Sequence, residues 1–85
     1  MRKDKLDNLK KILECLKEAE DWIWLRECAR RTGLHHSTIS RLLRDIEEFI
    51  DQQYIEALNI RMIKLKNKDL DINAILKVTE IKRRL

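Results

Sequence analysis

The stretch that decides the fold is residues 25–46, LRECARRTGLHHSTISRLLRDI. Its apolar residues recur at helical spacing on both sides of Gly33, which is the only glycine in the 85-residue chain. Leu25, Cys28 and Ala29 predict the inward face of a short helix over residues 25–32. Gly33 breaks this helix, because glycine adopts a left-handed backbone at the lowest steric cost. A second helix is predicted from about residue 35 to residue 49, with an apolar stripe made of Ile39, Leu42, Leu43, Ile46, Phe49 and Ile50.

These two helices and their turn resemble a helix-turn-helix. Ala29 is small where two helices must cross closely, Leu34 fills the space under the turn, and Ile39 and Leu42 pack the second helix onto the first. In this motif the opposite face of the second helix enters the major groove of DNA. Hydroxyl groups bond phosphates or base edges, and arginine bonds guanine as a fork. The polar residues left on that face are Ser37, Thr38, Ser40, Arg41 and Arg44.

Further elements are predicted on both sides of the motif. Residues 4–19 predict a helix with an apolar stripe, from which Cys15 lies about 100° away. Residues 22–24 are aromatic and β-branched and predict a short strand. Residues 52–66 allow two interpretations, a hairpin turning at Leu58–Asn59 or a continuation of the preceding helix, and their β-branched content favours the hairpin. A last helix is predicted over about residues 71–83, ending in the basic cluster Lys82–Arg84.

The order of elements is similar to that of the winged-helix transcriptional regulators of bacteria and archaea, such as the multiple-antibiotic-resistance and arsenic-repressor families. The likeness covers residues 22–66 as an order of elements and residues 25–47 at the level of individual residues. It implies a mainly α fold with a small β-hairpin, in which residues 1–85 form one winged-helix domain. The helix over about residues 36–49 would then be the recognition helix, and the hairpin would be a wing near the phosphate backbone or minor groove.

The sequence departs from this pattern at two places. His35 stands where such proteins usually have Ser or Asp as the helix N-cap, so Ser37 is a candidate substitute. The wing tip lacks the glycine and the extra basic residues of longer wings. An added terminal helix often forms the dimer interface in related regulators, which implies a homodimer through the first and last helices.

Charge is strongly segregated along the chain. The net charge is +4, and 40% of the residues are charged, in a chain without proline, which would suit a heat-adapted archaeal or thermophile-like protein. Residues 26–44 hold five arginines and one acid, residues 45–56 hold five acids and no base, and residues 61–68 hold four bases and no acid. Two basic segments separated by an acidic one predict opposed faces and a footprint for a polyanion.

Other classes of protein fit less well. No apolar run approaches the roughly 18 residues of a membrane span, and the N-terminus has no secretory signal, so we expect a cytoplasmic protein without membrane contact. Glu47 and Glu48 lack a nucleophile or a second orienting group, so we expect no enzyme. His35, His36 and Cys28 match no zinc spacing, and we expect no metal and no cofactor. Trp22 and Trp24 are expected to pack in the core under the wing.

The sequence therefore predicts a regulator that binds double-stranded DNA. The alternative is a winged-helix module that binds another protein without DNA, with residues 45–56 and the terminal helices as its docking surface. For the DNA-binding hypothesis, the candidate contacts lie on the recognition helix, on the preceding helix near the backbone, and on the wing. They are His36, Ser37, Thr38, Ser40, Arg41 and Arg44, then Arg30 and Arg31, then Arg61, Lys64 and Lys66.

Overall fold

The computed structural model describes residues 3–84 and their side chains as far as Lys82. Of the predicted C-terminal cluster, the side chains of Arg83 and Arg84 lie outside the described residues. The chain forms a mainly helical fold with a small antiparallel sheet, the winged helix-turn-helix that the sequence predicts. The elements are α1 (Lys3–Glu18), β1 (Ile23–Trp24), α2 (Leu25–Thr32), α3 (His36–Asp45), β2 (Ile50–Ile55), β3 (Ile60–Leu65) and α4 (Ile72–Arg84). Two short 3-10 turns, Glu47–Phe49 and Glu56–Leu58, complete the chain.

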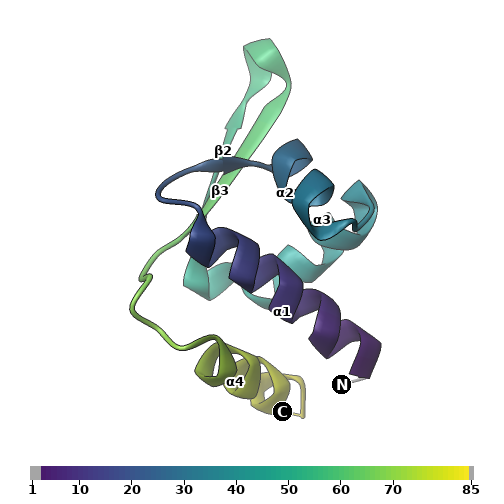
Figure 1. Cartoon of the computed structure of the whole chain (residues 1–85), viewed down its shortest axis with the longest axis vertical. Coiled ribbons are helices and arrows are strands. Elements are labelled where there is room, and N and C mark those ends of the chain that lie inside the picture. The colour runs from purple at the N-terminus through teal and green to yellow at the C-terminus, as the bar shows by residue number, and fades with distance from the viewer. Residues whose placement is uncertain (1–2, 85) are drawn as a thin grey trace.

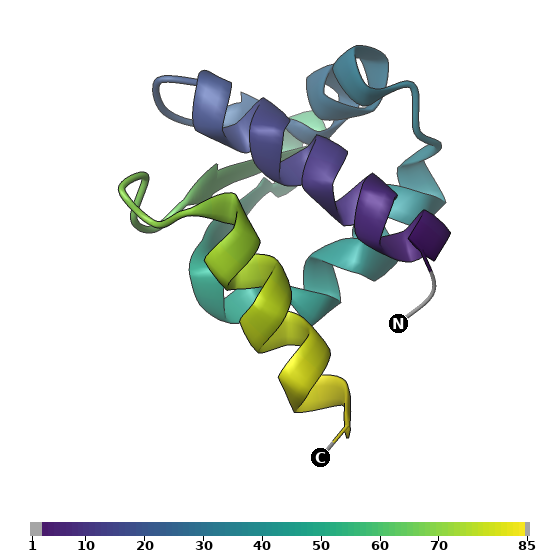
Figure 2. The same cartoon turned by 60° about the horizontal axis from the view of Figure 1, so that its bottom comes forward.

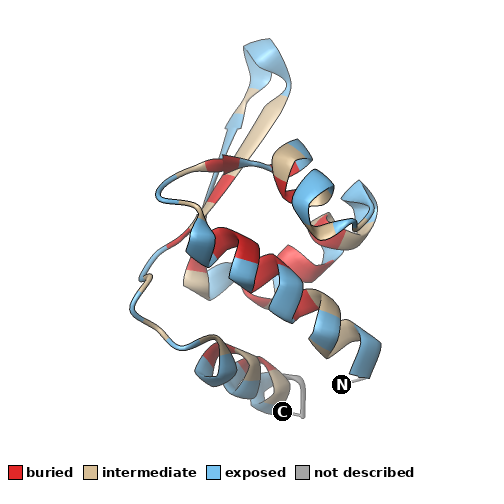
Figure 3. Cartoon of the chain, viewed as in Figure 1, coloured by how far each residue is buried: buried red, intermediate tan, exposed pale blue. Residues whose placement is uncertain are grey.

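Helix α1 is the centre of the core. Its apolar stripe is fully buried at Leu9, Ile12, Leu13 and Leu16, and the helix packs against α2, β3 and α4. Figure 1 shows α2 and α3 on one side of α1 and α4 on the other, and Figure 3 shows much of the α1 ribbon coloured as buried. Cys15 lies off this stripe and is also buried, because α2 covers the flank of α1 that carries it.

The turn between α2 and α3 has the predicted conformation. Gly33 is left-handed, with φ 74° and ψ 10°, and its N–H donates to the Ala29 carbonyl at 2.9 Å. His35 then caps α3, since its Nδ1 accepts from the Ser37 backbone N–H at 3.2 Å. The suggestion that Ser37 replaces His35 as the cap is therefore wrong, and Ser37 is instead the donor to that cap.

The helix that the sequence predicts as the recognition helix, α3, ends earlier than expected. Helix α3 stops at Asp45, and Ile46 leaves the helical conformation with φ −120° and ψ 19°. The expected helix to residue 49 is wrong because the Phe49 carbonyl accepts from the Lys66 N–H at 2.9 Å and Ile50 pairs with Leu65. The last two apolar residues of the predicted helical stripe, Phe49 and Ile50, therefore lie in a 3-10 turn and in β2.

Residues 50–65 form the predicted hairpin. The sheet order is β1-β3-β2, with Ile23 opposite Ile63 and Gln52 also opposite Ile63. Asn59 turns the chain with a positive φ of 52°. Ile63 and Leu65 are buried, and the alternation of strand residues puts Lys64 on the other face of the sheet. The hairpin projects from the helices as a wing (Figure 1).

Helix α4 packs on α1 through its buried residues. Ile75 and Thr79 are almost fully buried, and the Lys17 ammonium donates to the Leu70 carbonyl at 3.2 Å just before the helix begins. Figure 2 shows the first turns of α4 near α1 and its C-terminal end pointing away from α1. A second apolar stripe at helical spacing, made of Ala74, Val78 and Ile81, stays exposed on α4.

Replacing Gly33 tests the turn. A Cβ at this position would meet nothing within 4 Å, so the effect comes from backbone strain and not from a clash. We expect Gly33→Ala to lower the free energy of unfolding by about 1–2 kcal/mol and Gly33→Asn to lower it less, since Asn tolerates a left-handed backbone. Urea unfolding followed by circular dichroism measures both. Equal stability of the Ala variant and the natural protein would contradict the assigned conformation.

Candidate nucleic-acid interface

The outward face of α3 gathers polar and basic side chains. Ile39, Leu42 and Leu43 fix the inner face of the helix because they are buried. The side chains between them are therefore held outward at helical spacing. His36, Ser37, Arg41 and Arg44 are exposed, and Thr38 and Ser40 are half-buried.

Arg61 joins the wing to this helix. Its Nη1 donates to Ser40 Oγ at 3.2 Å, and its Nε donates to Gln52 Oε1 at 2.9 Å. One guanidinium thus links α3, β2 and β3. Because Ser40 accepts this bond, its own hydroxyl hydrogen remains available to a ligand.

A groove of about 380 Å³ lies between the wing and the first residues of α2 and α3. Three of its lining residues bear basic groups: Arg26, His36 and Arg61. Arg26 is absent from the residues that the sequence predicts to contact DNA. Its only signal is membership of the basic stretch over residues 26–44, and this signal does not show on which side of α2 it lies. The rest of the lining is Trp24, Leu25, Tyr54, Leu58, Asn59 and Ile60.

Trp24 does not have the predicted core position. It is 49% exposed and lines the groove, whereas Trp22 is half-buried. Trp24 is the last residue of β1, directly before α2. The chain turns into the helix there, and the side chain is left at the edge of the sheet.

Arg30 and Arg31 both donate hydrogen bonds to the carboxylate of Glu27. Arg30 Nε donates to both carboxylate oxygens of Glu27, at 3.0 and 3.1 Å, and Arg31 Nε donates to Oε1 at 3.3 Å. The hydrogen bonds from Arg30 lower the pKa of the Glu27 carboxyl, and the same pairing raises the pKa of Arg30. A phosphate near this helix would compete with Glu27 for both guanidinium groups.

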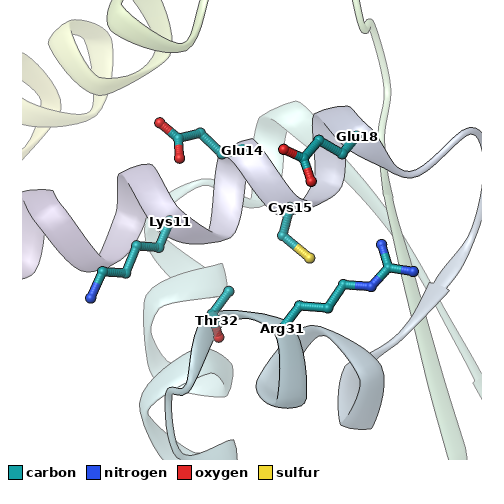
Figure 4. A pocket seen from close by; sticks show the side chains of 6 residues that line it. All are labelled: Lys11, Glu14, Cys15, Glu18, Arg31 and Thr32. Carbon is teal, nitrogen blue, oxygen red and sulfur yellow. The ribbon is translucent and has the colours of Figure 1, made fainter.

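Arg31 faces α1 and not the α3 side of α2. It lines a recess of about 310 Å³ between α1 and α2 (Figure 4). The figure shows the Arg31 guanidinium extending toward the end of α1 that carries Glu18. The Cys15 thiol lies between the two helices. The remaining lining residues are Lys11, Glu14 and Thr32.

The wing lysines also lie apart from α3. Lys64 contacts Asp21, with 3.8 Å between Nζ and Oδ1, and its ammonium lies 4.9 Å from the centre of the Trp22 ring. It is on the sheet face opposite to Arg61, and Lys66 follows the end of β3 at the base of the wing. The structure therefore brings Arg61 to α3, whereas the Lys64 side chain lies against Asp21 and Trp22.

The two buried cysteines lie together between α1 and α2. Both are free thiols, and the environment of each influences the pKa of the other. Burial raises the pKa of Cys15, and burial next to Cys15 raises that of Cys28 from 9.0 to about 12. Neither thiol is therefore poised for nucleophilic chemistry at neutral pH.

Alkylation tests this assignment. A Cys28 pKa of about 12 in place of 9.0 leaves roughly a thousandfold less thiolate at neutral pH. With iodoacetamide at pH 8 we expect slow labelling of the folded protein and fast labelling of both cysteines in urea, measured by mass spectrometry. The same shift makes the free energy of unfolding fall as the pH rises from 9 toward 12. Labelling of Cys28 at one rate in both conditions would refute its burial.

Among residues 3–84, no helix is both long and apolar enough to cross a membrane. Within the same residues, no three side chains of His, Cys, Asp or Glu are grouped so that they could hold a metal ion.

Comparison with known proteins agrees with this geometry. The family model described as the IclR helix-turn-helix domain matches residues 6–49, which run from α1 to the end of the 3-10 turn after α3. No curated protein matches the chain. The match confirms a helix-turn-helix of transcriptional regulators. The finer likeness to the multiple-antibiotic-resistance and arsenic-repressor families stays a prediction.

Proposed function

This chain belongs to the IclR helix-turn-helix family of DNA-binding domains of transcription regulators, and we propose that it recognises a specific duplex sequence with α3 in the major groove. The observation that carries the proposal is the exposed polar face of α3, with Arg41 and Arg44 side by side at a spacing of three residues. An α-helix with its side chains is about 10–12 Å in diameter, which fits a major groove about 12 Å wide, and the 10 residues of α3 extend for about 15 Å.

The residues of that face suit base recognition. Arg41 and Arg44 offer forked donors for guanine O6 and N7. Ser37, Thr38 and Ser40 offer hydroxyl groups for base edges or phosphates. The Ser40 side chain is already positioned by Arg61, at 3.2 Å, so little conformational freedom is lost when it binds.

Phosphate contacts would come from the edges of this face. Arg26, His36 and Arg61 line the groove beside the wing, and Arg30 is exposed on α2. Arg31, Lys64 and Lys66 lie farther from α3, and we propose that they strengthen the positive field there without direct contacts to bases. Counterion release then supplies much of the affinity, which should fall steeply between about 50 and 200 mM salt.

A second copy of the chain would complete the regulator. We propose a homodimer through the first and last helices, because Val78 and Ile81 are 41% and 56% exposed on a stripe that α1 does not cover. A two-fold pair would place its two recognition helices in successive major grooves, with half-sites about 34–36 Å apart.

Substitutions on α3 test the DNA-binding face. We expect Arg41→Ala and Arg44→Ala each to weaken binding by about 1–3 kcal/mol, with relaxed sequence preference where the side chain contacts a base. Lys10→Ala, on the exposed side of α1, is the matched loss of one charge and should change binding little. Gel-shift titration measures all three variants, with duplexes selected from a random pool and with random duplex at two salt concentrations.

Two outcomes would refute parts of this proposal. Unchanged binding of both arginine variants would exclude the assigned face. A protein that binds no duplex even at low salt, and forms a stable complex with another chain, would instead be an interaction module that docks through its acidic residues 45–56.

The dimer has its own test. We expect Val78→Asp and Ile81→Asp to convert a dimer into monomers, because a charge placed in an apolar contact is strongly unfavourable without a partner. Asn73→Asp, exposed elsewhere on α4, is the control for added charge. Sedimentation velocity gives the oligomeric state. A natural protein that is monomeric at micromolar concentration, or aspartate variants that remain dimeric, would contradict the proposed interface.

A further inference from the structure

Two thiols lie together in the core, one on α1 and one on α2. Cys28 is fully buried and Cys15 is 5% exposed, and both belong to the same cluster of buried residues. Each is free, and each is among the groups that shift the pKa of the other, which is an effect of close neighbours. The proposed function uses neither thiol, since both are buried where α1 packs on α2.

The recess between α1 and α2 gives this pair an opening to solvent. Cys15 lines the recess, and Figure 4 shows its side chain pointing from α1 toward α2, with Arg31 beside it. The recess has a volume of about 310 Å³, far more than one water molecule or one ion occupies. An ion therefore has a path to Cys15 that does not cross the apolar core.

Two thiols without a third ligand suit one class of ion. Structural zinc sites take four ligands, and among residues 3–84 no group of three His, Cys, Asp or Glu side chains could hold a metal ion. Soft thiolate ligands select monovalent copper, Cu(I), which is held by as few as two sulfur atoms in a line. The sequence predicts no metal because His35, His36 and Cys28 lack a zinc spacing, which Cu(I) does not require.

Arg31 supplies the charge that such a site needs. When Cu(I) binds, each thiol releases its proton to water, so the neutral pair becomes a complex of one cation and two thiolates with one net negative charge. A buried charge is unfavourable unless a partner compensates it. Burial raises the pKa of both thiols, and Arg31 acts in the opposite direction on each, whereas Glu18 opposes Arg31 at Cys15. The Arg31 guanidinium thus stabilises negative charge on both sulfur atoms.

We propose that Cys15 and Cys28 bind one Cu(I) ion between α1 and α2, with Arg31 as the compensating charge. This metal site goes beyond the proposed function and does not depend on DNA binding. Because Cys28 belongs to α2, the ion links the first helix of the helix-turn-helix to α1. The unfolded chain does not hold the two thiols together, so Cu(I) should stabilise the folded chain.

Competition with a Cu(I) chelator tests the site. The reduced natural protein is titrated with Cu(I) under nitrogen against bicinchoninate, whose copper complex is coloured. We expect one ion per chain and an affinity that rises by about a hundredfold per pH unit near neutral pH, because two protons leave. Cys15→Ala and Cys28→Ala each keep one thiol, and we expect them to bind at least roughly a hundredfold more weakly. Circular dichroism checks that each variant is folded.

A second cation isolates the role of Arg31. Hg(II) also binds two thiolates, but its complex is neutral. We expect Arg31→Gln to weaken Cu(I) binding about tenfold and to leave Hg(II) binding, measured in competition with dithiothreitol, nearly unchanged. Arg30→Gln is the matched loss of charge, since Arg30 also pairs with Glu27 but does not line the recess, and it should change neither affinity. Both variants keep the two cysteines, so they test the site even where a cysteine variant does not fold.

Thermal unfolding separates a folded site from two flexible thiols. An ion held between α1 and α2 raises the Tm of the natural protein, whereas an ion that prefers the unfolded chain lowers it. The proposal is overturned by an unchanged or lowered Tm, or by folded cysteine variants that bind Cu(I) as tightly as the natural protein. Equal Cu(I) affinities of Arg31→Gln and Arg30→Gln would remove Arg31 from the site.

Discussion

Burial of the α1 stripe is the constraint on which the rest of the structure depends. Each fully buried Leu or Ile contributes about 1.5–3 kcal/mol, and a small chain has few of them. Leu9, Ile12, Leu13 and Leu16 are covered from several sides at once, by α2, β3 and α4. Because the helix-turn-helix is supported from behind in this way, α3 needs no cover on its outer face. That face is the one that the fold leaves available to DNA.

Two of the acids that follow the recognition face of α3 are ion-paired with the terminal helices. Asp45 contacts the Lys5 ammonium at 3.0 Å, and Glu48 contacts the Lys82 ammonium at 2.7 Å. The acidic stretch after α3 is thus partly neutralised by the two terminal helices, while the arginines of α3 point to solvent. At the other end of the surface, Arg61 fixes the distance between wing and helix through two side chains. Arg61 thus connects the outward face of α3 to the hairpin.

Local patterns predicted most of the fold. The bounds of α2 follow from three inward residues and one glycine, and the hairpin follows from β-branched content and an asparagine that accepts a positive φ. Helical periodicity gave a wrong prediction at residues 49–50, because their spacing fits a helix although they belong to a turn and a strand. Phe49 and Ile50 fit a helical stripe equally well, and only the pairing of Ile50 with Leu65 draws them into a turn and a strand.

For the candidate site as well, some features could be predicted from the sequence and others were decided by the tertiary structure. The sequence by itself determined the helix-turn-helix motif and the outward face of α3, because spacing along one helix fixes which side chains share a face. Only the tertiary structure decided that Arg31 turns toward α1, that Lys64 stacks on Trp22, and that Arg26 and Trp24 line a groove with the wing. The direction of a surface side chain depends on which distant segment packs beside it, and no local pattern contains that neighbour.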